Sequence, residues 1–197
     1  MKGGEVLTDA QIVQACKNGD RDAFNELMEK YQDMVFGMAY SLLSDYEDAK
    51  DASQEIFIKV YKSISSFKGQ SAFTTWLYVI CRNVCNDILR KRQKGGAAII
   101  SLDADTDDES PVREVKSDAP TPEERAEMNE TQRLVRDAIN SLKPEYREIL
   151  IYADIHQLSN DEVAKILKCP LGTVKSRLNR ARNALRKKLS EKRELFS

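Results

Sequence analysis

The chain has 197 residues, of which 32% are charged, and a formal net charge of −1. Its apolar runs are too short to span a bilayer, and the N-terminal MKGGEVLTD lacks the apolar core of a signal peptide. These features exclude a membrane-spanning or exported protein as the expected class. Together with four cysteines, which suit a reducing compartment, they predict a cytoplasmic protein.

Residues 1–94 predict a helical module. Thr8 and Gln11 form a capping box at the start of a short helix that runs to Gly19. A second helix is expected after Asp20, because the residues that follow include apolar side chains at helical spacing. These are Phe24, Leu27, Met28, Tyr31, Met34, Val35, Met38 and Leu42.

A third helix is predicted from a capping box at Ser44 and Glu47 to about Ile64. Its buried stripe is expected to comprise Ala49, Ala52, Ile56 and Val60. A second face sets three carboxylates in a row, with an amide beside them: Asp48, Asp51, Glu55 and Gln54. Acids near a helix N-terminus stabilise the helix dipole, so a structural role suffices for them. A binding role would require a basic partner.

A fourth helix is predicted from about Phe73 to Lys94, with a long apolar seam. Aromatic residues gather at its start and cations at its end, an arrangement that suits stacked single-stranded bases and their phosphates. Periodicity alone, however, favours Phe73 and Trp76 as core residues. Cys81 and Cys85 share one helix face, and buried core thiols are the favoured interpretation.

An acidic linker is expected over residues 95–120. It opens with Gly95-Gly96 and has no amphipathic period, and the range 103–130 contains eleven acids and three bases. Two roles stay open for it: a solubilising spacer, or an acidic segment that repels DNA or lies against a basic surface.

Residues 121–197 predict a second helical module with a helix-turn-helix motif. Ser159 and Glu162 form a capping box, and Pro170 ends one helix and suits the first turn of the next. One face of that second helix is apolar, formed by Val174, Leu178, Ala181 and Leu185. The range 165–188 contains nine Lys or Arg and no acid, a charge purity typical of phosphate binding rather than of a solvated helix.

No chemistry of an enzyme is evident in the sequence. It has no glycine-rich phosphate loop and no nucleophile–base set, and its single histidine, His156, lies far along the chain from Cys81 and Cys85. We therefore expect an all-α, two-domain binding protein that is not an enzyme and that needs no cofactor and no metal.

Together the two modules resemble a bacterial RNA polymerase sigma factor of the small, two-domain extracytoplasmic-function (ECF) group. The tokens DASQEIF, FKGQSAFTTWL, RNVCNDILRKR and GTVKSRLNRAR carry the resemblance, in the order and spacing of the family. One departure is Lys168, which stands where the turn of the motif usually has glycine. A different turn is expected there, because positive φ costs a non-glycine residue about 1 kcal/mol.

The resemblance implies a role for each face. Residues 1–94 would be sigma domain 2, and residues 121–197 would be sigma domain 4. Core polymerase, through the clamp of its largest subunit, would bind Asp48, Asp51, Gln54 and Glu55. Single-stranded −10 DNA would bind Phe67, Lys68, Ser71, Phe73, Thr74, Trp76, Asn83, Asp87, Arg90 and Arg92. Duplex −35 DNA would bind Thr173, Lys175, Ser176, Arg177, Asn179 and Arg180.

The resemblance also implies an anti-sigma partner, which could hold the chain at the membrane, and a linker that threads into polymerase. Two alternatives stay open: a stand-alone helix-turn-helix regulator, and a sigma mimic that titrates an anti-sigma factor. The first would leave the N-terminal aromatic and acidic residues without a task. The intact basic helices argue against the second.

Overall fold

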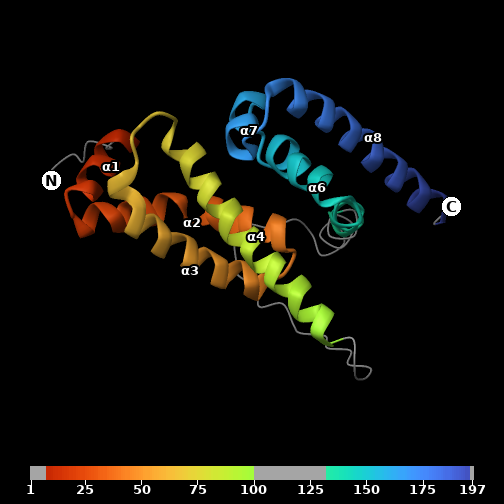
Figure 1. Cartoon of the computed structure of the whole chain (residues 1–197), viewed down its shortest axis with the longest axis horizontal. Coiled ribbons are helices and arrows are strands. Elements are labelled where there is room, and N and C mark those ends of the chain that lie inside the picture. Colours follow the sequence, from red (N-terminus) through yellow and green to blue (C-terminus); the bar gives the residue numbers. More distant parts are fainter. Residues whose placement is uncertain (1–7, 100–131, 196–197) are drawn as a thin grey trace, which may run out of the picture.

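The computed structural model describes residues 8–99 and 132–195, and within these ranges all regular structure is helical (Figure 1). The predicted all-α class is therefore confirmed. The N-terminal module (residues 8–99) contains α1 (Asp9–Lys17), α2 (Arg21–Leu43), α3 (Tyr46–Ser63), the short η1 (Ile64–Ser66) and α4 (Phe73–Ile99). The C-terminal module (residues 132–195) contains a helix at 132–140, then α6 (Pro144–Leu150), η2 (Ile151–Ile155), α7 (Asn160–Leu167) and α8 (Leu171–Leu195).

The helix starts follow the side chains that satisfy their free amides. The capping box at Thr8 and Gln11 is present. The one predicted at Ser44 is wrong: Ser44 takes a left-handed conformation, φ 58°, at the end of α2, and Asp45 caps α3 by accepting the Asp48 amide at 2.8 Å. Asp and Ser are equally good N-caps, so the left-handed conformation of Ser44 at the end of α2 is what leaves Asp45 to cap α3.

The N-terminal module is a bundle in which α4 packs on both α2 and α3. The seam of α4 is buried as expected, with Leu77, Cys81, Val84 and Cys85 fully covered. Burial raises the pKa of the Cys85 thiol to about 12 and that of Cys81 further still, so neither thiol is reactive at neutral pH. The helix continues through Gly95 to Ile99, farther than predicted. The rest of the expected linker, up to residue 120, lies outside the described residues.

The C-terminal module contains the predicted helix-turn-helix. Ser159 and Glu162 cap α7 reciprocally, and Val174, Leu178 and Ala181 on α8 are buried. Lys168 ends α7 in the left-handed conformation, with φ 52° and ψ 46°. The lysine thus takes the backbone conformation that glycine would take, at a cost of about 1 kcal/mol, rather than a different path.

The two modules pack against each other, a contact that no pattern in the sequence predicted. Helix α4 contacts α7, and the ring of Tyr78 meets the edges of Tyr152 and His156 at centroid distances of 6.4 and 5.8 Å. Beside these rings, Arg82 Nε and Nη2 donate to the two carboxylate oxygens of Glu148 at 2.5 and 3.3 Å. Both side chains are largely buried, so this ion pair lies within the interface between the modules.

A second contact between the modules lies at the C-terminal end of α2. The Arg136 guanidinium lies 4.7 Å from the centroid of the Tyr40 ring and also bonds its hydroxyl. The hydroxyl of Ser44 bonds the side chain of Asn140 at 3.0 Å.

None of the described helices is both long and apolar enough to cross a membrane.

The Arg82–Glu148 pair predicts a measurable coupling between the modules. In a double-mutant cycle with Arg82→Ala and Glu148→Ala, we expect a coupling energy of about 1–3 kcal/mol in urea unfolding, because a charge-assisted bond is lost from a largely buried site. The control is Arg90–Asp87, a pair 2.9 Å apart and far more exposed, for which less than about 1 kcal/mol is expected. Equal coupling in the two pairs would contradict the prediction.

His156 predicts a pH-dependent stability. Burial lowers its pKa, and its Nε2 atom has no hydrogen-bond partner among the described residues. The unfolded chain therefore takes up the proton first, so the free energy of unfolding should fall as the pH drops below about 6.5. Since His156 is the chain's single histidine, His156→Phe should flatten the slope between pH 7 and 5 in urea titrations. A slope unchanged by this substitution would refute the prediction.

Candidate nucleic-acid interface

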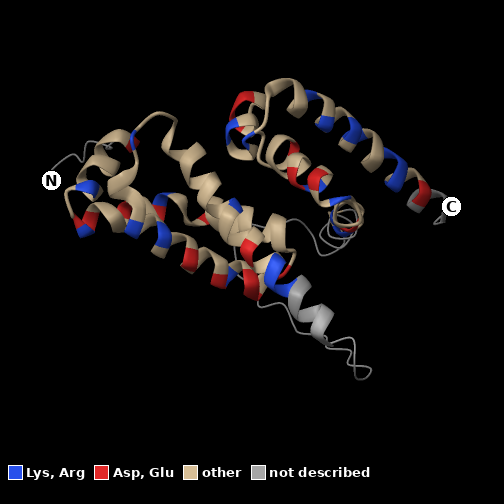
Figure 2. Ribbon diagram, viewed as in Figure 1, with Lys and Arg blue, Asp and Glu red and all other residues tan. Residues whose placement is uncertain are grey.

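The outer face of α8 is basic and polar. Lys175, Ser176, Asn179 and Arg180 are exposed, while Thr173 and Arg177 are half-buried. The buried residues on the opposite face hold the helix against α6 and α7, so the orientation of the exposed set is fixed. Figure 2 shows Lys and Arg along most of α8, with acid only near its C-terminal end. A helix of this kind can enter a major groove and contact both phosphates and base edges.

One cation on α8 serves the fold instead. Arg182 donates to both carboxylate oxygens of Asp154 at 3.1 and 2.5 Å, and these bonds raise its pKa. This pair anchors α8 to the end of η2. Among the described residues, the exposed set on the outer face makes side-chain hydrogen bonds only within α8: the Ser176 hydroxyl donates to the Thr173 carbonyl, and Asn179 Oδ1 accepts from the Asn183 amide.

Three aromatic rings meet at the start of α4. Phe67 lies 5.8 Å from Phe73 and 5.2 Å from Trp76, and Phe73 lies 5.6 Å from Trp76. Phe73 is buried, as periodicity indicates, whereas Phe67 and Trp76 are only half-buried. Those two rings therefore offer the surface on which a base could stack. We call Phe67, Phe73 and Trp76 the aromatic cluster.

The other residues predicted to contact −10 DNA are spread along α4 and the loop before it. Lys68 and Asn83 are exposed, and Ser71 and Thr74 are half-buried. Asp87 pairs with Arg90, and Arg92 pairs with Asp48 of α3. Arg92 lies 16 residues after Trp76, which is about 24 Å along a helix, so the structure brings the aromatic residues together but not the cations.

The predicted acidic face of α3 is divided by the fold. Asp51, Gln54 and Glu55 are exposed, but Asp48 is taken up by its pair with Arg92. Glu55 pairs with Lys59 at 2.9 Å, one turn further along the same helix, and both side chains are exposed to solvent. The face thus presents the Asp51 carboxylate without an ion-pair partner among the described residues, with the neutral amide of Gln54 exposed beside it.

An apolar groove between α2 and α3 lies next to this face and was not foreseen from the sequence. It has a volume of about 870 Å³, and Gln54 is one of its lining residues. The exposed hydrophobic side chains Met28, Ile58 and Tyr61, which are 36%, 53% and 55% exposed, form part of its wall. The sequence did contain a signal for this groove, because Ile58 and Tyr61 are apolar residues of α3 that do not fall on its buried stripe.

Both modules match known families. The family model for Sigma-70 region 2 matches residues 27–95, and the one for Sigma-70 region 4 matches residues 132–185. The ECF RNA polymerase sigma-E factor of Haemophilus influenzae is 37% identical, over 94% of this chain and 97% of that protein. The ECF sigma factor SigW of Bacillus subtilis is 34% identical, over 95% and 99% of the respective chains.

Solved structures agree with this assignment. The sigma factor RpoE of Bartonella quintana, in complex with the anti-sigma factor NepR, matches with a TM-score of 0.64 and 26% identity, covering 85% of this chain and 96% of that one. CnrH, in complex with the cytosolic domain of CnrY, shares the fold with a TM-score of 0.66 and 20% identity, over 91% and 96% of the respective chains. With a basic helix-turn-helix in one module and an aromatic cluster in the other, this chain belongs to the ECF sigma factors, non-enzymatic transcription initiation factors that bind core RNA polymerase and direct it to promoters.

Proposed function

We propose that the N-terminal module captures the opened −10 strand while the C-terminal module binds the −35 duplex. The observation that carries this proposal is the presence, on one chain, of an exposed basic helix face and a half-buried aromatic pair. Phe67 and Trp76 stack on unpaired bases, each worth about 1–3 kcal/mol, which offsets the few kcal/mol needed to extrude a base. Lys175, Arg177 and Arg180 bind duplex phosphates and base edges.

Core polymerase docks on α3 in this proposal, through Asp51, Gln54 and Glu55 and the adjoining apolar groove. The groove supports this because its exposed Ile58 and Tyr61 would be covered in the complex, and the neighbouring carboxylates would meet basic residues at its rim. Asp48 contributes indirectly, since its pair with Arg92 joins α3 to the end of α4.

Binding both promoter elements at once requires the modules to separate. In the packed arrangement α7 contacts both α4 and α8, so about two helix spacings of 8–10 Å lie between α4 and α8. Promoter elements more than one turn of DNA apart are separated by at least about 34–36 Å, which is longer than this spacing between the helix axes. We propose that polymerase holds the modules apart.

An anti-sigma factor is the proposed regulator, since the matched RpoE of Bartonella quintana is in complex with one. We place the free chain in the cytoplasm. The family assignment favours promoter-directed initiation over a stand-alone regulator or a sigma mimic, and run-off transcription tests this choice. Purified core polymerase with this chain, on a library of bacterial upstream regions, should give promoter-specific transcripts. Duplex binding without such transcripts would favour the stand-alone regulator.

For the −35 site, Arg180→Ala should lower transcription from −35-dependent promoters. If Arg180 contacts a base edge, the loss should correspond to about 1–3 kcal/mol of promoter-binding free energy. The loss should vary with the −35 sequence, which a phosphate contact would not cause. Lys143→Ala is the control, because it removes another exposed cation of the same module that is not on α8. A loss that is uniform across promoters would contradict base contact by Arg180.

For the docking site, Ile58→Glu should weaken binding to core polymerase at least tenfold, because it places a charge in an apolar contact worth about 1.5–3 kcal/mol. Ile155→Glu is the matched control: Ile155 is 47% exposed, close to the 53% of Ile58, but lies in η2 of the other module. Fluorescence anisotropy of the labelled chain measures both affinities. Equal effects of the two substitutions would refute docking in the groove.

A further inference from the structure

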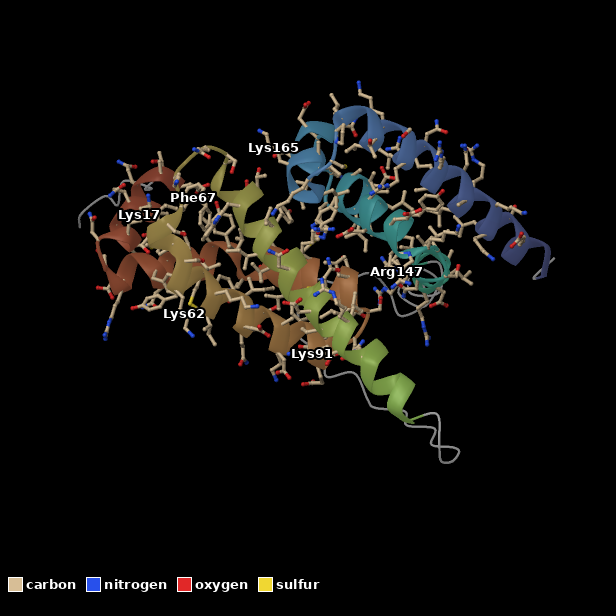
Figure 3. All side chains as sticks on the ribbon, in the orientation of Figure 1. Lys17, Lys62, Phe67, Lys91, Arg147 and Lys165 are labelled. Atoms are coloured by element: carbon tan, nitrogen blue, oxygen red, sulfur yellow. The ribbon has the colours of Figure 1, made fainter. Side chains whose placement is uncertain are left out.

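Helix α1 brings a lysine to the aromatic cluster, although it precedes the stretch matched by the Sigma-70 region 2 family model. The Lys17 amine lies 5.9 Å from the centroid of the Phe67 ring. Figure 3 shows the two labelled residues side by side at the same end of the module. Helix α1 packs directly on η1, the turn that precedes Phe67, so this proximity follows from the packing of the backbone.

Lys17 is held in place but is left without a countercharge. Ile12, Val13 and Cys16 are buried and anchor α1, which fixes the base of the half-buried Lys17 side chain. Within the described ranges, 8–99 and 132–195, Lys17 forms no ion pair.

Two of the acids near Lys17 along the chain, Asp9 and Asp20, are engaged by other groups. Asp9 pairs with Lys30 at 2.6 Å and accepts the Tyr31 hydroxyl at 2.5 Å. Asp20 accepts the amides of Asp22 and Ala23 and so caps α2. An ammonium beside an accessible ring, with no ion-pair partner among the described residues, is an arrangement that suits an incoming anion.

We propose that Lys17 binds the phosphate next to the base that stacks on Phe67, so that α1 forms part of the single-strand site. This inference rests on the proposed capture of single-stranded DNA by the aromatic cluster. A ring holds a base by its face and a lysine neutralises the adjoining backbone, the pairing used in single-strand sites. The competing explanation is that Lys17 is only a cation in the last turn of a helix, favoured by the dipole.

Lys62 is the matched control for that explanation. Like Lys17, it is a lysine in the last turn of its helix, here α3, and it lies five residues before Phe67 along the chain. It is exposed, whereas Lys17 is half-buried, and it makes no ring contact among the described residues. Removing either lysine changes the net charge by the same amount and removes the interaction of one cation with the C-terminal end of a helix dipole. Only Lys17→Ala removes the proposed phosphate contact, whereas Lys17→Arg preserves a cation there.

The experiment titrates the full chain and its variants with a twelve-nucleotide oligo(dT) at several salt concentrations. Trp76, the sole tryptophan of the chain, reports binding at the aromatic cluster through its fluorescence. Loss of one single-strand phosphate contact lowers the slope of log K against log salt by about 0.7. We expect that decrease for Lys17→Ala and no decrease for Lys62→Ala or Lys17→Arg, with all variants unfolding at the same temperature.

The outcomes separate this inference from the function on which it rests. If oligo(dT) changes the fluorescence but Lys17→Ala keeps the slope of the unsubstituted chain, the role of Lys17 is refuted and the site stands. Equal decreases in Lys17→Ala and Lys62→Ala would also refute it, since they would report general charge. A chain whose Trp76 does not respond to oligo(dT) at any salt concentration would refute the single-strand site itself.

Discussion

Helix α4 belongs to two cores at once, and the rest of the molecule depends on that sharing. Its apolar seam completes the bundle with α2 and α3, while Tyr78 and Arg82 on another face meet the C-terminal module. The aromatic cluster lies at its start, and the pair of Arg92 with Asp48 lies toward its end. A shift of α4 would therefore change the proposed DNA site and the contact between modules together, because one rigid element carries both.

The pairing of charges distinguishes structural side chains from those available to a partner. Arg82, Arg92 and Arg182 have carboxylate partners on other helices, and each ties two elements together. Lys175 and Arg180 have no ion-pair partner among the described residues. Exposed cations that the fold does not use are available to neutralise phosphates, so the same residue type serves both purposes on one helix.

The sequence predicted most of the fold, because local signals determine helices. Capping boxes at Thr8 and Ser159 marked helix starts, and spacing identified the buried face of α8. The start of α3 was misassigned because Ser44 and Asp45 are both good caps, and only the left-handed end of α2 decides between them. The Arg82–Glu148 pair could not be foreseen, since 66 residues separate its members and no local pattern encodes such a contact.

The candidate sites followed the same division. The exposed face of α8 was predictable, because helical spacing alone separates it from the buried face. The pairing of Asp48 with Arg92 was not predictable, since it depends on how α3 and α4 lie against each other. The same holds for the approach of Lys17 to Phe67, which depends on the packing of α1 on η1.

The polar atoms left unpaired near the contact between modules bear on how tightly the chain closes. The Tyr152 hydroxyl and His156 Nε2 are buried without hydrogen-bond partners among the described residues, and such atoms cost about 1–3 kcal/mol each. As free partners the modules would associate weakly. Joined on one chain, they meet at an effective concentration that can reach the millimolar range, so even a weak contact closes the molecule. A partner that binds either module more tightly than the other module does can reverse this closure.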